Sequence, residues 1–315
     1  RRTGDDRLIR RHAETLERFV RFLAACDSDG NGVPDLGVAN TIDDASPAVQ
    51  FGKEQVYLAV KALAAHATGA EMMRWVGRAE AAALADDLAA RIRETIRRKG
   101  WKKDHFVTLL NKSAQGLINP WTKKPLETKT LPGWDAAHIY TANALPPLDM
   151  VGFDAGMDPR RLAKDLAVAT ERCLREFGCV HSDFEEGAVT GADDSMLGLA
   201  GVSRNPGWIA MNLLRDMAAF YRGVDLRYLA DRYWDWQVLT NTQEPKLFFE
   251  TFNGNNLCFY PRGLVVWGFF DALAGRVIDR VRGMDEAKPA FKQVRVPRLI
   301  DADWAPASTP TPPAR

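Results

Sequence analysis

Residues 27–60 read DSDGNGVPDLGVANTIDDASPAVQFGKEQVYLAV, a run in which an Asp-rich loop leads to a pair of acids and then to an apolar helix. The pair, Asp43 and Asp44, stands just before Ser46, a residue type that caps helix N-termini. Two adjacent like charges raise the pKa of one acid relative to the other, which suits a general acid that works near neutral pH. The alternative is that both acids only favour the dipole of the following helix.

The Asp-rich loop has part of the spacing of an EF-hand calcium loop. Its candidate ligands are Asp27, Asp29, Asn31, the backbone carbonyl of Val33, and Asp35. Gly32 occupies the position where such a loop turns through a left-handed conformation. Position 12 is Val38, so the closing bidentate Glu is missing. A structural Ca²⁺ site and a solvated Asp/Gly turn both remain open.

Composition excludes some classes of partner. The chain has 315 residues and 46% hydrophobic content, enough for a sizeable core. Its 42 Lys and Arg balance 41 Asp and Glu, so no net field recruits nucleic acid or an anionic membrane. Nine Trp and 10% aromatic residues exceed what a helical domain needs, and aromatic faces stack on sugar rings.

The compartment is weakly specified by the sequence. Four cysteines (Cys26, Cys173, Cys179 and Cys258) have no zinc-like pairing and leave the redox compartment open. No apolar run reaches the length of a membrane span, and the chain begins without Met inside a charged stretch. We expect a soluble piece of a longer protein, with a secreted or periplasmic location favoured.

Helical periodicity covers most of the chain, and strand-like alternation is scarce. The predicted helices lie near 8–26, 49–66, 70–98, 135–149, 158–176, 206–222 and 263–281. Asp158-Pro159 opens one of them as an N-cap followed by Pro at the first helical position. The pattern predicts an all-α chain.

Long polar and aromatic connections separate the helices, at 27–48, 100–134, 177–206 and 239–261. Loops of this length are typically functional or disordered. Helical hairpins with long loops at one end are typical of an (α/α)6 toroid-type barrel with a pocket over the ring. We therefore expect residues 1–303 to form one helical, catalytic-type domain, incomplete at its N-terminus, and residues 304–315 to be a disordered Pro/Thr-rich tail.

Candidate substrate-binding groups concentrate in these connections. Amides, acids and aromatic residues of 241–256 can bind vicinal hydroxyls and pack on a sugar face, although a self-bonded glycine turn is equally consistent. The candidates are Glu244, Asn253, Asn255, Asn256, Arg262, Trp134, Asp135 and His138. A second acidic cluster, at 182–187 with Asp193 and Asp194, is either a solvated loop or a second ligand set. The five His residues show no metal spacing, and neither a nucleophile elbow nor a phosphate loop is present.

Three elements carry a resemblance to a known family. They are Asp29-Gly30 with Asn40-Thr41-Ile42-Asp43 and Ser46-Pro47, then the Trp-led helix 207–219, then Tyr260-Pro261-Arg262 through Trp267. Their order resembles the clan of retaining glycosidases that joins the bacterial β-xylosidases to the bile-acid β-glucosidase family, which are built on an (α/α)6 barrel. The resemblance covers most of residues 20–280.

The resemblance implies roles for particular residues. It places the general acid/base on Asp43, and it gives Glu244 or Glu250 the sugar-binding Glu at the subsite of the cleaved bond. Ile42 replaces an aromatic residue of the family, Asp44 is an extra acid, and the order of the Tyr260 element is altered. The family's nucleophilic Glu lies well upstream of the acid, so it falls outside this chain.

The sequence as a whole predicts a β-glycosidase-like glycoside hydrolase acting on an oligosaccharide or glycoside. In a retaining scheme Asp43 is the acid/base, and an N-terminal β-sandwich domain belongs to the same protein. In an inverting scheme Asp43 pairs with Glu250 or Asp194. A carbohydrate-binding toroid without activity is an alternative. An α/α-toroid lyase or amidohydrolase is another, in which the His138-Ile-Tyr140 stretch acts on a uronate.

Overall fold

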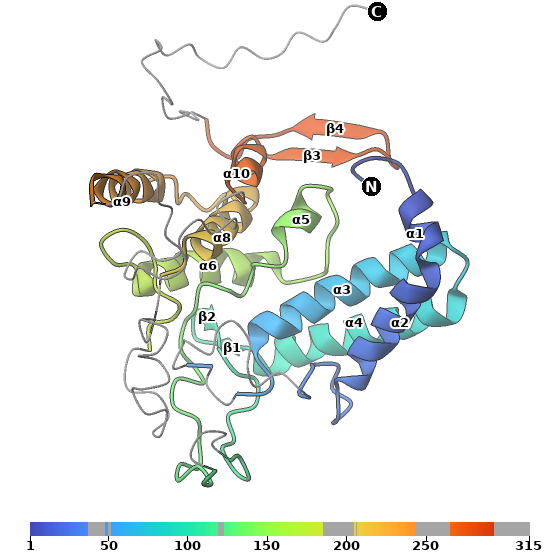
Figure 1. Cartoon of the computed structure of the whole chain (residues 1–315), viewed down its shortest axis with the longest axis horizontal. Helices are drawn as coiled ribbons and strands as arrows, with labels where there is room; N and C mark the ends of the chain where they lie inside the picture. Colours follow the sequence, from blue (N-terminus) through green and yellow to red (C-terminus); the bar gives the residue numbers. More distant parts are fainter. Residues whose placement is uncertain are drawn as a thin grey trace, which may run out of the picture.

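The computed structural model describes residues 1–36, 48–49, 52–118, 123–184, 205, 207–243 and 265–292. Its helices are α1 (Arg7–Arg11), α2 (Ala13–Ala25), α3 (Val56–Trp75), α4 (Ala79–Lys99), α5 (Pro146–Asp149), α6 (Pro159–Cys173), α8 (Ile209–Tyr221), α9 (Leu229–Gln243) and α10 (Val266–Leu273). Its strands are β1 (Trp101–Lys102), β2 (His105–Phe106), β3 (Arg276–Asp279) and β4 (Met284–Ala287). Figure 1 shows α2, α3 and α4 side by side in one part of the molecule, with α6, α8 and α10 in the other.

The chain is not all-α, and the prediction of an (α/α)6 toroid-type barrel is wrong. Within the described residues, β1 pairs with β2 and β3 pairs with β4, each as a two-stranded antiparallel sheet. Strands of two to four residues are too short to display an alternating pattern. The helical periodicity of their neighbours therefore concealed them in the sequence.

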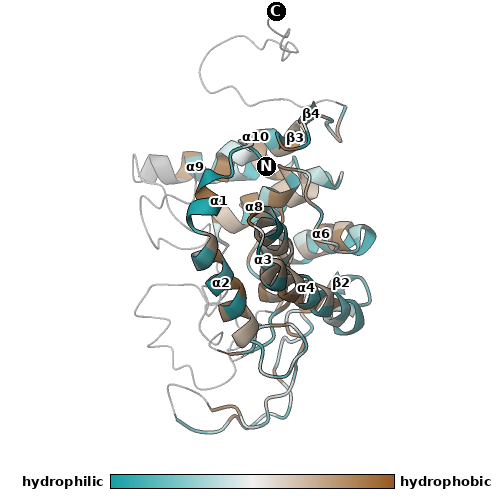
Figure 2. Ribbon diagram, turned by 90° about the vertical axis from the view of Figure 1, so that its right-hand side faces the viewer, coloured by the Kyte–Doolittle hydropathy of each residue, from teal (hydrophilic) through white to brown (hydrophobic). Residues whose placement is uncertain are grey.

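The α3–α4 hairpin forms the central layer of the fold. Twelve of the twenty residues of α3 are buried, because apolar and small side chains surround the helix on all sides. The hairpin turns at Gly77, which has a φ of +75°. The Gly77 N–H donates to the Arg74 carbonyl at 3.2 Å and the Arg78 N–H to the Met73 carbonyl at 2.9 Å, the two bonds of a Schellman motif. Figure 2 shows the hydrophobic colouring concentrated on α3 and the neighbouring face of α4.

Several predicted helices change their boundaries. The helix predicted near 49–66 begins later, at Val56 with Gln55 at its N-cap, and Ser46 lies outside the described residues. Of residues 135–149, only Pro146–Asp149 is helical. Helix α9 was missed. The Asp158 cap of α6 is confirmed: its carboxylate accepts hydrogen bonds from the Arg160 and Arg161 N–H groups at 2.9 and 3.1 Å.

A fully buried polar network joins α8 to α9. Arg215 is 0% exposed, and its guanidinium donates to Asp216 Oδ1 at 2.8 Å and to Asn212 Oδ1 at 3.2 Å. Tyr233, from α9, donates its hydroxyl to Asp216 Oδ2 at 2.7 Å. The network pairs the two charges that α8 buries, those of Arg215 and Asp216. This pairing offsets the free-energy cost of removing the two charged groups from water.

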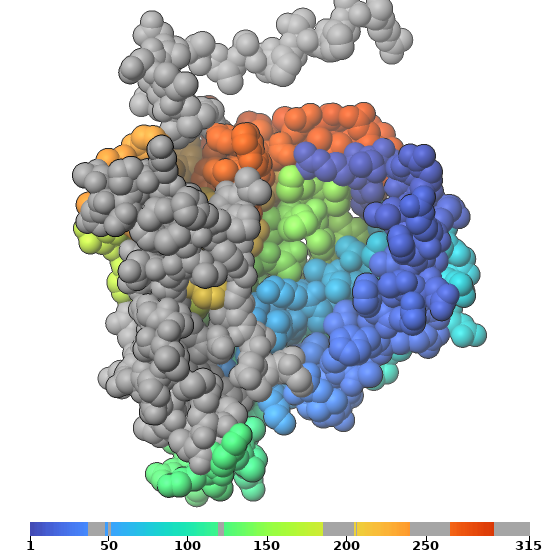
Figure 3. Space-filling view, in the orientation of Figure 1, coloured from blue at the N-terminus to red at the C-terminus, as the bar shows by residue number. Residues whose placement is uncertain are grey.

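The first residue of the chain, Arg1, packs beside the β3–β4 hairpin. Arg1 forms ion pairs with Glu71 of α3 and with the buried Asp279 of β3. Figure 3 shows the same neighbourhood on the surface, where the blue N-terminal residues border the orange β3–β4 hairpin. These pairs connect the N-terminal helices to the C-terminal part of the described chain.

The loop at 27–35 is docked on α4. Val33 is fully buried in the main core, and the Thr95 hydroxyl donates to the Asn31 carbonyl at 2.8 Å. Gly32 has a φ of +87°, and a Cβ atom there would lie 2.9 Å from the backbone nitrogen of Ile92. Glycine is therefore required at this position both by conformation and by the close approach of α4.

Candidate functional site

A hollow of about 370 Å³ opens beside the β1–β2 hairpin, and it gathers charged side chains from four distant segments. It is lined by Lys102, Lys103, His105, Gly133, Asp135, Ala136, Arg172, Asp183 and Phe184. Lys102 and His105 face each other as a cross-strand pair of the hairpin. The tight turn between them requires a left-handed φ of 56° at Lys103. The hairpin thus delivers a lysine and a histidine to the same hollow.

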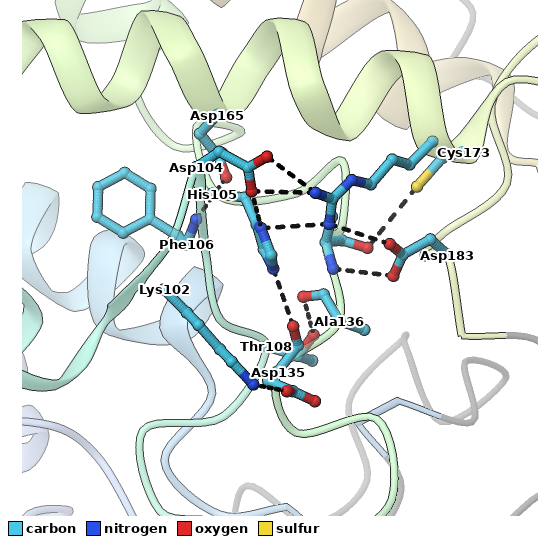
Figure 4. A network of polar contacts seen from close by, with 12 residues as sticks. Lys102, Asp104, His105, Phe106, Thr108, Asp135, Ala136, Asp165, Cys173 and Asp183 are labelled. Carbon is cyan, nitrogen blue, oxygen red and sulfur yellow. Dashed lines mark hydrogen bonds and ion pairs between the residues drawn. The ribbon is translucent and has the colours of Figure 1, made fainter.

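His105 is held at both ring nitrogens (Figure 4). Its Nε2 lies 2.8 Å from the backbone oxygen of Asp135, so this nitrogen carries the hydrogen and donates it. Its Nδ1 lies 2.8 Å from Asp104 Oδ1 and 3.4 Å from Arg172 Nη1. The ring therefore cannot rotate without breaking contacts to the hairpin, to α6 and to the 135–141 segment.

Arg172, near the end of α6, bridges two acids. Its Nη2 donates to both oxygens of Asp104 at 3.0 and 2.9 Å, and its Nη1 lies 3.5 Å from Asp183 Oδ2. The contact with the His105 ring and the charge of Arg172 lower the pKa of Asp104. Asp183 also accepts a hydrogen bond from the Ala137 N–H at 2.9 Å. These contacts thereby hold both acids in fixed orientations.

Lys102 and Asp135 form an ion pair on the opposite side of the hollow (Figure 4). Both side chains remain more than one third exposed, so a ligand can reach them. The Lys102 ammonium also lies 4.9 Å from the centroid of the Trp134 ring, and the Lys112 ammonium 4.8 Å from it. Two cations therefore lie close to the Trp134 ring.

The wall of the hollow includes a close backbone approach. Gly133 has a φ of +71°, and a Cβ atom there would lie 2.6 Å from Phe184 Cδ1 and 3.0 Å from Ala48 Cα. Ala48 is buried and follows Asp43 by five residues in the sequence. The end of the segment that carries Asp43 and Asp44 therefore packs directly against this wall.

A buried acid supports the hairpin from behind. Asp165 of α6 accepts a hydrogen bond from the Phe106 N–H at 2.7 Å, and it is 1% exposed. Burial raises the pKa of Asp165 to about 7, and the hydrogen bond from the Phe106 N–H opposes this effect. Asp165 fixes β2, and through it His105, but it does not line the hollow.

Some of the predicted substrate-binding residues lie at the hollow, and one of them lies away from it. Asp135 lines the hollow, and Trp134 stands next to it under the Lys102 ammonium. His138 does not reach the hollow: it is 3% exposed, and burial lowers its pKa to about 4. The other predicted residues lie outside the described residues: Asp43, Asp44, Glu244, Glu250, Asn253, Asn255, Asn256 and Arg262.

Most of the hollow's charged residues were missed from the sequence. His105 looked isolated because its partners, Asp104 apart, come from residues 135 and 172. Asp183 belonged to the acidic cluster at 182–187, which the sequence left open as either a solvated loop or a second ligand set. A local signal was present in the Lys102-Lys-Asp-His105 turn, where four charged or titratable residues stand between the aromatic Trp101 and Phe106.

The predicted calcium ligands lie close together in one loop, but several of them bond to the loop itself. Asp27 accepts hydrogen bonds from the N–H groups of Gly30, Asn31 and Gly32. Asp35 accepts from the Ser28 N–H and hydroxyl. Among the described residues, no three His, Cys, Asp or Glu side chains surround one point as in a preformed metal centre. No helix in the described ranges has the length and apolarity needed to cross a bilayer.

Comparison with known proteins supports the fold alone. No family model matches the chain, and no curated protein matches it. A solved structure of a protein described as "Sialidase" superposes with a TM-score of 0.60 at 10% sequence identity. The match covers 91% of this chain and 26% of that protein, so the chain spans about a quarter of that protein's length.

Proposed function

We propose that this chain is the sugar-binding portion of a glycoside hydrolase, that the hollow at Lys102, Asp135, Arg172 and Asp183 receives a sugar of the substrate, and that Asp43 is the general acid/base. The observation that carries the proposal is the packing of Ala48 against Gly133, which joins the Asp43 segment to the wall of the hollow. The fold likeness to a protein described as a sialidase is consistent with glycosidase chemistry.

The distance from Asp43 to the hollow is bounded by the chain itself. Five residues of fully extended backbone span at most about 18 Å, so Asp43 lies within that distance of Ala48 in any conformation. A general acid must come within hydrogen-bonding distance of the glycosidic oxygen. A sugar in the hollow and a second sugar or aglycone beyond it together cover the remaining distance.

The chemistry of the hollow suits a hydroxylated, neutral or acidic ring. Its acids accept hydrogen bonds from sugar hydroxyls, and its lysine and arginine donate them. Its volume of about 370 Å³ falls at the small end of ligand pockets, which measure about 300–1,000 Å³. Phe184 adds an apolar surface to the wall. The ring held there is therefore expected to be a single sugar unit.

In the proposed reaction Asp43 donates its proton to the glycosidic oxygen as the bond to the anomeric carbon breaks. In a retaining course a Glu outside this chain attacks the anomeric carbon, and Asp43 then takes a proton from the water that releases the sugar. In an inverting course a second acid, Glu250 or Asp194, activates the water directly.

A lyase or amidohydrolase built on His138 and Tyr140 is less consistent with the geometry. The two ring centroids are 6.2 Å apart, but His138 is 3% and Tyr140 2% exposed. A polysaccharide chain cannot contact either ring in this arrangement.

The proposal is tested with the full-length protein on a panel of 4-nitrophenyl glycosides and a 4-methylumbelliferyl sialoside. Asp135→Asn removes a charged acceptor from the hollow, and kcat/KM for the substrate that is turned over is expected to fall about 10–100-fold. Asp86→Asn is the matched control, since Asp86 is an exposed, ion-paired acid of α4 outside the hollow. Equal effects of the two variants, or no cleavage of any glycoside, would contradict the proposal.

A further inference from the structure

Positive charge concentrates on two segments of the chain. Residues 93–105 and 158–172 together hold ten Lys and Arg against five Asp and Glu, a net charge of +5 on 28 residues. The whole chain carries a net charge of only +1, so the remaining residues are acidic on balance. The first segment is the end of α4 with most of the β1–β2 hairpin, and the second is α6 with its N-cap.

Arg161 of α6 joins the two segments in space. Its Nη1 atom donates to the Arg97 carbonyl of α4 at 3.3 Å, and its guanidinium lies 5.4 Å from the centroid of the Trp101 ring. Arg93, one turn earlier in α4, donates from Nε to the Ala155 carbonyl at 3.0 Å, just ahead of α6. Figure 2 shows α6 beside α4 and β2. The basic side chains of both segments therefore lie on adjoining parts of the surface.

Helix α6 continues the positive charge to the hollow. Arg161, Lys164 and Arg172 project from one side of α6, because spacings of three, eight and eleven residues return to nearly the same face of a helix. At 1.5 Å per residue, about 17 Å of helix separates the first from the last. Arg172 lines the hollow, as does the exposed Lys103 at the hairpin turn. A row of cations therefore runs along α6 from the end of α4 to the hollow.

These cations are accessible to a ligand. The side chains of Arg97 and Arg98 are more than half exposed, and that of Arg161 is more than one third exposed. Glu94 lies 2.6 Å from Arg97 and 3.5 Å from Arg98, so one acid is shared between two guanidinium groups. Exposed ion pairs of this kind contribute at most about 1 kcal/mol, so an anionic ligand displaces them at little cost. The basic strip that ends at the hollow consists of Arg97, Arg98, Arg161, Lys164 and Arg172.

We propose that the basic strip binds a linear polysaccharide that carries anionic groups, carboxylate or sulfate, and that the hollow receives one sugar of the same chain. The inference rests on the proposed function and names the class of its substrate. Guanidinium groups bind carboxylate and similar oxyanions through two parallel hydrogen bonds, which suits anionic groups repeated along a chain. The hollow holds a single sugar unit, and the strip extends beyond it along α6, so the strip contacts the sugars that follow.

Nucleic acid is a less suitable ligand for this surface. Domains that bind nucleic acid are typically basic as a whole, whereas this chain has a net charge of +1. The strip also ends at a hollow lined by Asp135 and Asp183, which repel a phosphate backbone. Sugar hydroxyls, in contrast, donate hydrogen bonds to such acids.

The test measures the binding of three hexasaccharides to the full-length protein by calorimetric titration. They are a galacturonic acid hexamer, a heparin hexasaccharide and neutral maltohexaose. At least one anionic hexasaccharide is expected to bind about tenfold or more tightly than maltohexaose, and added salt is expected to weaken this binding because it screens exposed charges. The affinities of the two anionic probes distinguish carboxylate recognition from sulfate recognition.

A pair of double variants localises the binding. Arg98→Gln with Lys164→Gln removes two exposed cations of the basic strip outside the hollow, and it is expected to weaken binding of the anionic hexasaccharide about tenfold. Arg74→Gln with Arg78→Gln is the matched control. These two arginines are more than half exposed at the turn between α3 and α4, and their loss changes the net charge by the same amount. The control is expected to leave binding unchanged.

Three outcomes overturn the inference: equal affinity for the anionic and neutral hexasaccharides, equal weakening by the two double variants, or tighter binding of a single-stranded DNA that carries as many charges as the anionic hexasaccharide. The proposed function fails separately. Cleavage of small aryl glycosides without a preference for anionic hexasaccharides contradicts the basic strip alone. Preferential binding that depends on Arg98 and Lys164, without cleavage of any glycoside, supports the strip and contradicts the hydrolase.

Discussion

Gly133 and Ala48 are in direct backbone contact: a Cβ atom placed on Gly133 would lie 3.0 Å from Ala48 Cα. Gly133 lines the hollow, and Ala48 ends the stretch that contains the two candidate catalytic acids. A contact between residues 85 positions apart in the sequence thereby joins the end of the segment that carries the acids to the wall of the hollow. It also makes Gly133 a position where a single methyl group tests the architecture.

Gly133→Ala is expected to destabilise the protein and to impair its activity. The substitution forces an alanine into a left-handed backbone conformation, and its methyl group overlaps Phe184 and Ala48. Gly116→Ala separates the two effects, because Gly116 has a φ of +76° and open space around its Cβ position. Urea unfolding is expected to show a loss of about 1 kcal/mol for Gly116→Ala and about 1–3 kcal/mol more for Gly133→Ala. Equal losses would mean that the contact with Ala48 has no energetic importance.

Lys102→Met is expected to separate stability from binding. The Lys102–Asp135 ion pair is more than one third exposed, so its loss is expected to change the free energy of unfolding by less than about 1 kcal/mol. A sugar in the hollow loses a charged donor, and its KM or dissociation constant is expected to rise about tenfold or more. Arg74→Met, which breaks an exposed pair on α4, is the control for both readouts. A binding constant unaffected by Lys102→Met would remove this lysine from the site.

The stability of the protein is expected to fall with rising pH because of Asp165. Its pKa is about 7 in the folded protein and near 3.8 in the unfolded chain, so the folded state binds more protons between these values. Stability is therefore lost as the pH rises through this window, by at most about 4 kcal/mol. For Asp165→Asn, the free energy of unfolding is expected to differ less between about pH 5 and about pH 8 than it does for the wild-type protein. Parallel pH profiles for the two proteins would show that Asp165 ionises normally.

Arg215→Met is expected to destabilise the protein by about 3–5 kcal/mol, because it leaves Asp216 buried without a counter-charge. Arg97→Met removes an exposed pair with Glu94 on α4 and is expected to cost less than about 1 kcal/mol. Denaturant unfolding of both variants measures the contrast. A loss for Arg215→Met no larger than that for Arg97→Met would mean that Asp216 is neutral when buried.

Long periodic helices could be predicted from the sequence, and short elements could not. The helix from Ala79 to Lys99 was predicted over 70–98 because good helix formers and a basic C-terminal turn agree over twenty residues. Asp158-Pro159 was identified because a cap is a local signal. The β1–β2 hairpin was missed since two-residue strands have no period, and α9 was missed within a stretch of mixed aromatic and polar residues.

The site was partly predictable for a similar reason. Asp135 was among the sequence candidates for sugar binding, and it lines the hollow. His138 was a candidate from the same stretch, but the His138–Ser182 bridge turns this segment into the core. His105 and Arg172 acquire their environment only when the hairpin docks on α6, 67 positions later in the chain. Tertiary contacts of that separation leave no pattern in a single sequence.

The most direct measurement of the central claim is the leaving-group dependence of glycoside cleavage by full-length protein with Asp43→Asn. Loss of the proton donor is expected to reduce kcat by about 10²–10⁴ for substrates with poor leaving groups, such as alkyl glycosides. For 2,4-dinitrophenyl glycosides, whose leaving group needs no proton, bond cleavage is expected to be nearly unchanged. A uniform reduction across the whole series, or full activity of Asp43→Asn on alkyl glycosides, would contradict the assignment of Asp43 as the general acid.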